Sequence, residues 1–158
     1  MNRIYADNAA TTPISATARR VLLETMDRAW GNPSSLHTTG QEAAEVLLKA
    51  RQDVAKCLNA AREREITFTS GGSESNTWAI RGTVPQGGHV VTTPIEHHSV
   101  LNACASIRDD GGRMTTLEVD GFGRVIPESL TRALAAHPNL VSLQYANNEV
   151  GAVSYTHL

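Results

Sequence analysis

A short run of small and hydroxyl-bearing residues, Ser70-Gly71-Gly72-Ser73-Glu74, follows an apolar stretch. Glycines let the backbone approach a ligand closely, and a helix that starts here offers free N–H groups and the positive end of its dipole. This pattern favours a bound phosphate, to which Ser73 adds a hydroxyl. The run lacks the Lys-Ser/Thr of a Walker A loop and the spacing of G-x-G-x-x-G. A helix capped by Ser73, with Glu74 and Asn76 in its first turn, explains the same residues.

Two adjacent histidines, His97 and His98, could bind a metal ion or lie against a flat ligand. Neighbouring residues diverge on a helix, and no Cys or Asp cluster has ligand spacing, so we predict no metal site. One imidazole could instead stack on a flat heteroaromatic ligand. We expect His98 to face solvent at an exposed helix start, which leaves His97 as the candidate for stacking.

The stretch Ala146–Gly151 reads Ala-Asn-Asn-Glu-Val-Gly and carries side-chain amides and a carboxylate. Asn148 could hold a polar ring substituent or a substrate carboxylate. The two asparagines could equally form a turn, with Glu149 capping it.

These clusters need a scaffold that brings them together. Apolar spacing predicts helices over 15–30 and about 40–58, joined by a Gly/Pro/Ser-rich loop. From about Ile66 to Tyr145, strand-like and helix-like stretches alternate, which predicts an α/β domain with a mainly parallel sheet and flanking helices. The three clusters each follow a predicted strand, and ligands bind beyond the carboxyl ends of such strands.

Composition limits the classes of function. The chain has 158 residues and a net charge of −2, which gives no support for a nucleic acid partner. No apolar run is long enough to span a bilayer, and no signal peptide is evident, so we expect no membrane partner. Two cysteines, Cys57 and Cys104, suggest a reducing cytoplasm and lie on apolar stripes, which favours core positions. Lys49 and Lys56 are expected on the surface.

Five stretches in order resemble the N-terminal part of a cysteine desulfurase, in the class V aminotransferase group of fold-type I pyridoxal-phosphate (PLP) enzymes. They are "YADNAATTP" from Tyr5, "GNPSSLHTTGQEA" from Gly31, "FTSGGSESN" from Phe68, "IEHHSV" from Ile95 and "YANNEVG" from Tyr145. The resemblance covers almost the whole chain. It implies part of an aspartate-aminotransferase-like (PLP-transferase) large domain.

The resemblance also implies roles for individual residues. Gly72 and Ser73 would hold the PLP phosphate, and His97 would stack over the pyridine ring and assist proton transfer. Asn148 would lie by the ring hydroxyl and the substrate carboxylate. The segments 8–12 and 32–33 would line the mouth of the site.

The family reaction takes sulfur from L-cysteine, leaves L-alanine, and forms an enzyme persulfide for iron–sulfur clusters or other thio-cofactors. The implied partners are L-cysteine, a sulfur-acceptor protein such as an iron–sulfur scaffold, and a second subunit in a homodimer.

Several family features are missing from this sequence. We find no Schiff-base lysine in a Ser-x-His-Lys setting and no persulfide cysteine of the mobile loop, so we expect this chain by itself to be inactive. We interpret it as a fragment: 1–14 lining the active site, 15–153 as the truncated N-terminal part of the large domain, and 154–158 as a foreign tail. Alternatives are another class V PLP enzyme, such as a selenocysteine lyase or an aminotransferase, or a non-catalytic fragment.

Overall fold

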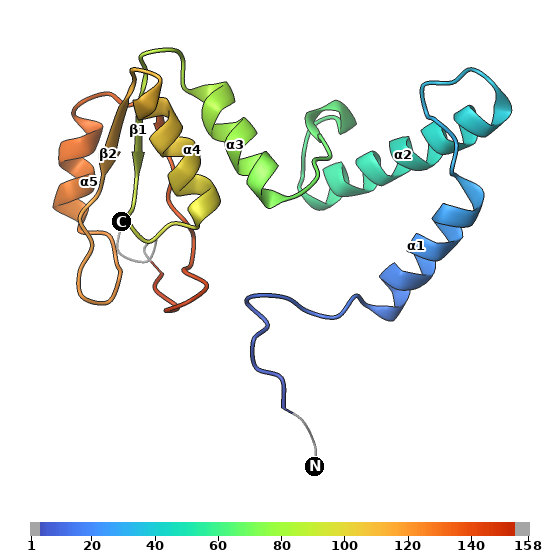
Figure 1. The fold of residues 1–158 in the computed structure, drawn as a ribbon, viewed down its shortest axis with the longest axis horizontal. Coiled ribbons are helices and arrows are strands. Elements are labelled where there is room, and N and C mark those ends of the chain that lie inside the picture. The colour runs from blue at the N-terminus through green and yellow to red at the C-terminus, as the bar shows by residue number, and fades with distance from the viewer. Residues whose placement is uncertain (1–3, 154–158) are drawn as a thin grey trace. The chain divides into compact units, whose positions relative to one another are not determined.

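The computed structural model describes residues 4–153. The tail at 154–158, which we interpret as foreign, lies outside the described residues. The chain divides into two compact units, with the division between Phe68 and Thr69 (Figure 1). The partition into 1–14, 15–153 and 154–158 stays a prediction.

The first unit contains two α-helices and a 3-10 turn. Helix α1 spans Ala16–Arg28, α2 spans Thr38–Cys57, and η1 spans Glu63–Glu65. The Ser15 hydroxyl caps α1 by accepting from the Ala18 N–H at 3.1 Å, and the His37 ring caps α2 by accepting from the Gly40 N–H at 3.3 Å. Both predicted helices are confirmed.

Little of the first unit is buried. No residue of α1 is buried, and α2 buries only Gly40, Ala43 and Ala55. Met26 is 63% exposed and Trp30 is 74% exposed, although the sequence places both on one apolar stripe. The periodicity therefore identifies the helix correctly, but among residues 4–68 no partner covers that stripe.

The second unit is a parallel sheet between helices (Figure 1). Its elements in chain order are α3 (Gly72–Thr83), β1 (His89–Thr92), α4 (His98–Asp109), β2 (Arg113–Thr116), α5 (Pro127–Leu134) and β3 (Leu140–Val141). The strand order is β2-β1-β3, and both pairings of β1 are parallel. The α/β class with a parallel sheet and flanking helices, predicted from the alternation of elements, is confirmed.

The central strand separates two apolar clusters. Side chains alternate between the faces of a strand, so Val90 and Val91, both fully buried, point to opposite sides. Val90 packs with residues of α3 and α4, including Ile80 and Cys104. Val91 packs with Ala133 of α5 and other apolar residues of that face. The helices therefore cover both faces, as a parallel sheet requires.

One predicted strand is absent. Residues 66–69, expected as the first strand of the α/β alternation, form no strand, and Phe68 is 46% exposed. A strand requires a hydrogen-bonded neighbour, and within residues 4–153 the three-stranded sheet offers no pairing to this segment. The apolar alternation at Ile66 and Phe68 was therefore misleading.

Candidate active site

The candidate phosphate-binding segment lies at the N-terminus of α3. The helix has Gly71 as its N-cap and no side-chain capping bond. The first main-chain bond runs from the Ser75 N–H to the Gly71 carbonyl at 3.1 Å. The amides of Gly72, Ser73 and Glu74 precede that bond, and no described residue accepts from them. Ser73 is therefore not the helix cap, and its hydroxyl has no described partner.

Neither glycine at this terminus is required by packing. A Cβ added to Gly71 or Gly72 would meet no atom within 4 Å, and the φ of 167° at Gly71 is ordinary extended backbone. The space beside these two glycines is therefore open, and the main-chain amides next to it are free of described partners. Such a donor set fits the oxygens of a phosphate.

Glu74 has a structural partner in the same turn. Its carboxylate accepts from the Ser70 N–H at 2.7 Å and from the Ser70 hydroxyl at 2.6 Å. The bonds from the Ser70 hydroxyl and N–H lower the pKa of Glu74 below its ordinary value. The Glu74 side chain thus fixes the chain just before the helix and carries a negative charge there.

His97 is the N-cap of α4 and is exposed. Its Nδ1 accepts from the Ser99 N–H at 3.1 Å and lies 2.8 Å from the Ser99 Oγ. The Asn76 side chain donates to the same Ser99 Oγ at 2.8 Å. The N-termini of α3 and α4 are thereby joined. His98 is also exposed, as predicted, and its ring lies 6.3 Å from that of His97, edge to face.

The two asparagines after β3 have different environments. Asn147 is buried; its Nδ2 donates to the Ile95 carbonyl at 2.9 Å, and its Oδ1 accepts from the N–H groups of Glu149 and Val150 at 2.8 Å each. Asn148 is exposed, and no described residue bonds its amide. Asn147 therefore makes the turn that the sequence allowed as an alternative, and Asn148 is left available to a ligand.

A buried carboxylate completes the connection between strand ends. Glu96 is 8% exposed, and its Oε1 accepts from the Gln144 N–H at 2.5 Å and from the Thr93 hydroxyl at 3.4 Å. Burial raises the pKa of Glu96 above its ordinary value. The Gln144 side chain also donates to the Ile95 carbonyl at 2.6 Å.

The three clusters predicted to share a site are thus brought together. Asn76 and Ser99 join the first cluster to the second, and Glu96, Gln144 and Asn147 join the second to the third. Sequence reasoning missed the structural roles of Glu96, Asn147 and Ser99. Their one signal was that they lie inside the motifs already singled out.

Other candidates lie elsewhere. Cys104 is buried, as expected, and burial raises the pKa of its thiol. Cys57 is exposed, so the prediction of a core position for it is wrong, since it lies in the last turn of a helix with few covered residues. Lys49 is exposed and pairs with Asp53. Among residues 4–153, His, Cys, Asp and Glu side chains nowhere gather in a group of three that could hold a metal ion. In the same range, no helix is both long and apolar enough to cross a bilayer.

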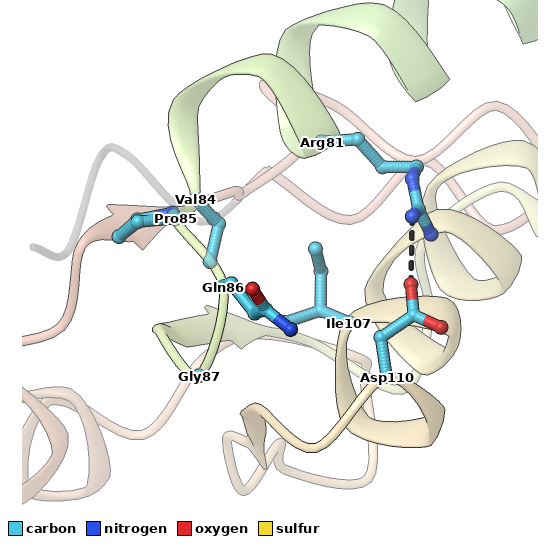
Figure 2. Close-up of a pocket in the computed structure, with 7 residues that line it drawn as sticks. All are labelled: Arg81, Val84, Pro85, Gln86, Gly87, Ile107 and Asp110. Carbon is cyan, nitrogen blue, oxygen red and sulfur yellow. Dashed lines mark hydrogen bonds and ion pairs between the residues drawn. The ribbon is translucent and has the colours of Figure 1, made fainter.

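A pocket of about 410 Å³ lies near the C-terminal ends of α3 and α4 (Figure 2). Its charged lining is already paired, because Arg81 donates to Asp110 at 2.6 Å and to the Ser106 hydroxyl at 2.7 Å. Figure 2 shows this ion pair on one side of the view, Pro85 and Val84 on the other, and Ile107 between them. The pocket is at the opposite ends of these helices from the three clusters, so it is not part of the candidate site.

Comparison with known proteins finds relatives that are similar over nearly the whole chain. Cysteine desulfurase IscS of Methanosarcina thermophila is 40% identical over 154 residues, covering 95% of this chain and 38% of that protein. Putative cysteine desulfurase IscS 1 of Bacillus subtilis (strain 168) is 42% identical over 157 residues, covering 97% of this chain and 41% of that protein. This chain therefore spans about two fifths of the length of these curated relatives.

Solved structures also match nearly the whole of this chain and less than half of their own length. A NifS-like protein matches with a TM-score of 0.87 at 34% identity, over 97% of this chain and 43% of that chain. The structure titled "SspA in complex with cysteine" matches with a TM-score of 0.83 at 32% identity, over 95% of this chain and 44% of that one. A family model described as aminotransferase class V, a PLP-dependent family, matches residues 4–157. That match extends over nearly the whole sequence, and the chain belongs to the class V aminotransferase family.

Proposed function

We propose that this chain forms the N-terminal part of a PLP-dependent cysteine desulfurase. The observation that carries the proposal is the free N-terminus of α3, where the amides of Gly72, Ser73 and Glu74 have no described partner and the space beside Gly71 and Gly72 is open. The names of the relatives point to cysteine as substrate, and one matched structure is titled as a complex with cysteine.

The residues present fit PLP as the group held at this site. The α3 amides and the Ser73 hydroxyl would donate to its phosphate, whose charge the helix dipole favours. The exposed face of His97 would lie against the pyridine ring. Asn148, with its amide free of described partners, would donate to the ring hydroxyl or to the substrate carboxylate. PLP, when bound, supplies the electron sink of the reaction.

His97 would also handle a proton. Its Nδ1 is occupied by the Ser99 N–H, and no described residue bonds Nε2. Because Nδ1 accepts, the neutral ring carries its hydrogen on Nε2, so Nε2 would present an N–H donor to the substrate. The ring keeps its orientation while doing so, because the helix cap holds the other nitrogen.

The wider setting follows from the same proposal. The overall reaction would convert L-cysteine to L-alanine and pass sulfur to an enzyme cysteine and then to an acceptor protein such as an iron–sulfur scaffold. We propose a homodimer, supported by the exposed apolar side chains of α1, and a cytoplasmic location, supported by two free thiols. Segments 8–12 and 32–33 as the mouth of the site stay a prediction.

Titration with PLP, followed by its absorbance, tests the phosphate site. We expect Gly72→Asp to abolish binding, because a carboxylate would stand beside the free amides. The matched control is Gly82→Asp on the same helix, where an added Cβ also meets nothing within 4 Å; it should bind PLP as the wild type does. Equal binding by all three proteins would refute the phosphate site.

The activity is tested on the longest protein that the gene encodes. L-Alanine and sulfide released in equal amounts from L-cysteine would support a desulfurase. Release of alanine from L-selenocysteine, with none from L-cysteine, would instead support a selenocysteine lyase.

A further inference from the structure

A hydrogen-bonded chain of three side chains connects the two helix N-termini of the candidate site. Asn76 of α3 donates to the Ser99 Oγ at 2.8 Å, and that oxygen lies 2.8 Å from the His97 Nδ1. Because the Ser99 oxygen accepts from Asn76, its own proton is available to the imidazole. Asn76 and Ser99 are both partly buried, whereas the His97 ring is exposed.

The roles of the atoms follow from the main chain. The Ser99 N–H donates to Nδ1 at 3.1 Å, so Nδ1 carries no hydrogen in this arrangement and can accept from the Ser99 hydroxyl as well. Two donors from one residue therefore hold one edge of the ring. The opposite edge, with Nε2, has no described partner.

The two helices that carry these hydrogen-bonded side chains are packed against each other. Helices α3 and α4 pack through Ile80 and Cys104, and further along them Arg81 bonds Ser106. Asn76 and Ser99 lie nearer the N-termini of the two helices, and Arg81 and Ser106 lie nearer their C-termini. The helices therefore run parallel, and their N-termini point the same way. The Asn76–Ser99 bond is the cross-link at the end that carries the free amides.

We propose that Ser99, supported by Asn76, is a positioning residue that holds the His97 imidazole at a fixed place relative to the α3 amides. The inference rests on the proposed function in one respect, namely that the His97 ring faces PLP. The hydroxyl supplies orientation, and the main-chain N–H keeps the cap when the hydroxyl is removed.

The first test needs no cofactor. In ¹⁵N-labelled chain, the His97 ring nitrogens are observed by long-range ¹H–¹⁵N correlation and assigned by their loss in His97→Gln. Ser99→Ala should move the Nδ1 signal downfield, since one donor is lost, and Ser99→Thr should restore it. The matched control, Ser106→Ala, removes a hydroxyl from the far end of the same helix and should leave the signal in place.

A double variant tests whether Asn76 acts on the His97 ring through Ser99. Asn76→Ala should shift the Nδ1 signal in the same direction by less than Ser99→Ala does. The double variant should match Ser99→Ala, because Asn76 acts only through the Ser99 oxygen. Additive shifts, an unmoved signal in Ser99→Ala, or an equal shift in Ser106→Ala would each overturn the inference.

PLP titration of the same variants tests the link to the cofactor. Ser99→Ala should bind PLP about three- to tenfold more weakly, as expected for one neutral hydrogen bond, and should change the absorbance of bound PLP. Inorganic phosphate, used as a competitor, should bind the variant and the wild type equally. Wild-type chain that binds no PLP refutes the proposed function, whereas the nitrogen signal alone decides the role of Ser99.

Discussion

The turn after β3 depends on Asn147, and replacing it by alanine should destabilise the second unit. The substitution removes three side-chain hydrogen bonds, to the Ile95 carbonyl and from the Glu149 and Val150 amides. Each such bond contributes about 0.5–1.5 kcal/mol net, so the free energy of unfolding should fall by about 2–4 kcal/mol. The residue is only 9% exposed, so water replaces the lost partners poorly.

Urea unfolding and amide hydrogen exchange check this prediction. The urea midpoint should fall by about 1–2 M for an m-value of about 2 kcal/mol/M. Protection of the Glu149 and Val150 amides should be lost as well. Asn148→Ala is the matched control: its side chain is exposed without a described partner, and the change should stay within about 0.5 kcal/mol. Equal costs for the two adjacent asparagines would refute the assigned division of roles.

Three further substitutions have defined outcomes. Glu96→Gln should remove a pH dependence of the free energy of unfolding. Because the pKa of Glu96 is raised in the folded state, the stability that it contributes is fully present below the ordinary value of 4.5 and is lost as pH rises through the folded-state pKa. Urea unfolding of the wild type and the variant between about pH 4 and pH 8 measures this difference. Gly72→Ala should leave the thermal midpoint nearly unchanged, because the added methyl meets nothing within 4 Å. It should still weaken PLP binding in the absorbance titration, because the methyl occupies the open space proposed for the phosphate. Gly112→Ala should cost about 1–3 kcal/mol in urea unfolding, since a Cβ there would lie 2.7 Å from the Gly88 carbonyl oxygen, whereas Gly121→Ala meets nothing within 4 Å and serves as its control.

Local sequence signals were sufficient for most elements of the fold. Apolar spacing located both long helices. Pro127 is another local signal, because it lies at the start of α5, where a proline loses no main-chain bond. The same signals failed at Ile66 and Phe68. Alternation describes which face of an extended chain is apolar, but whether a strand forms depends on a neighbour elsewhere in the sequence.

Burial was less predictable than secondary structure. The stripe on α1 and the position of Cys57 both indicated a core, yet the described part of the first unit leaves them exposed. Periodicity fixes the relative orientation of side chains on one helix. It carries no information about what lies opposite that face.

The sequence by itself determined the α/β class and the three polar clusters, because each is encoded in residues adjacent in the chain. Two of the clusters follow strands, as predicted, whereas the first follows a segment that forms no strand. The tertiary structure decided how those clusters are joined and which residue of each faces outward. Asn147 is buried and Asn148 is exposed, and Asn76 reaches Ser99 across two packed helices. Such bonds connect residues more than twenty positions apart, so only the packing of the sheet and helices brings their atoms within reach.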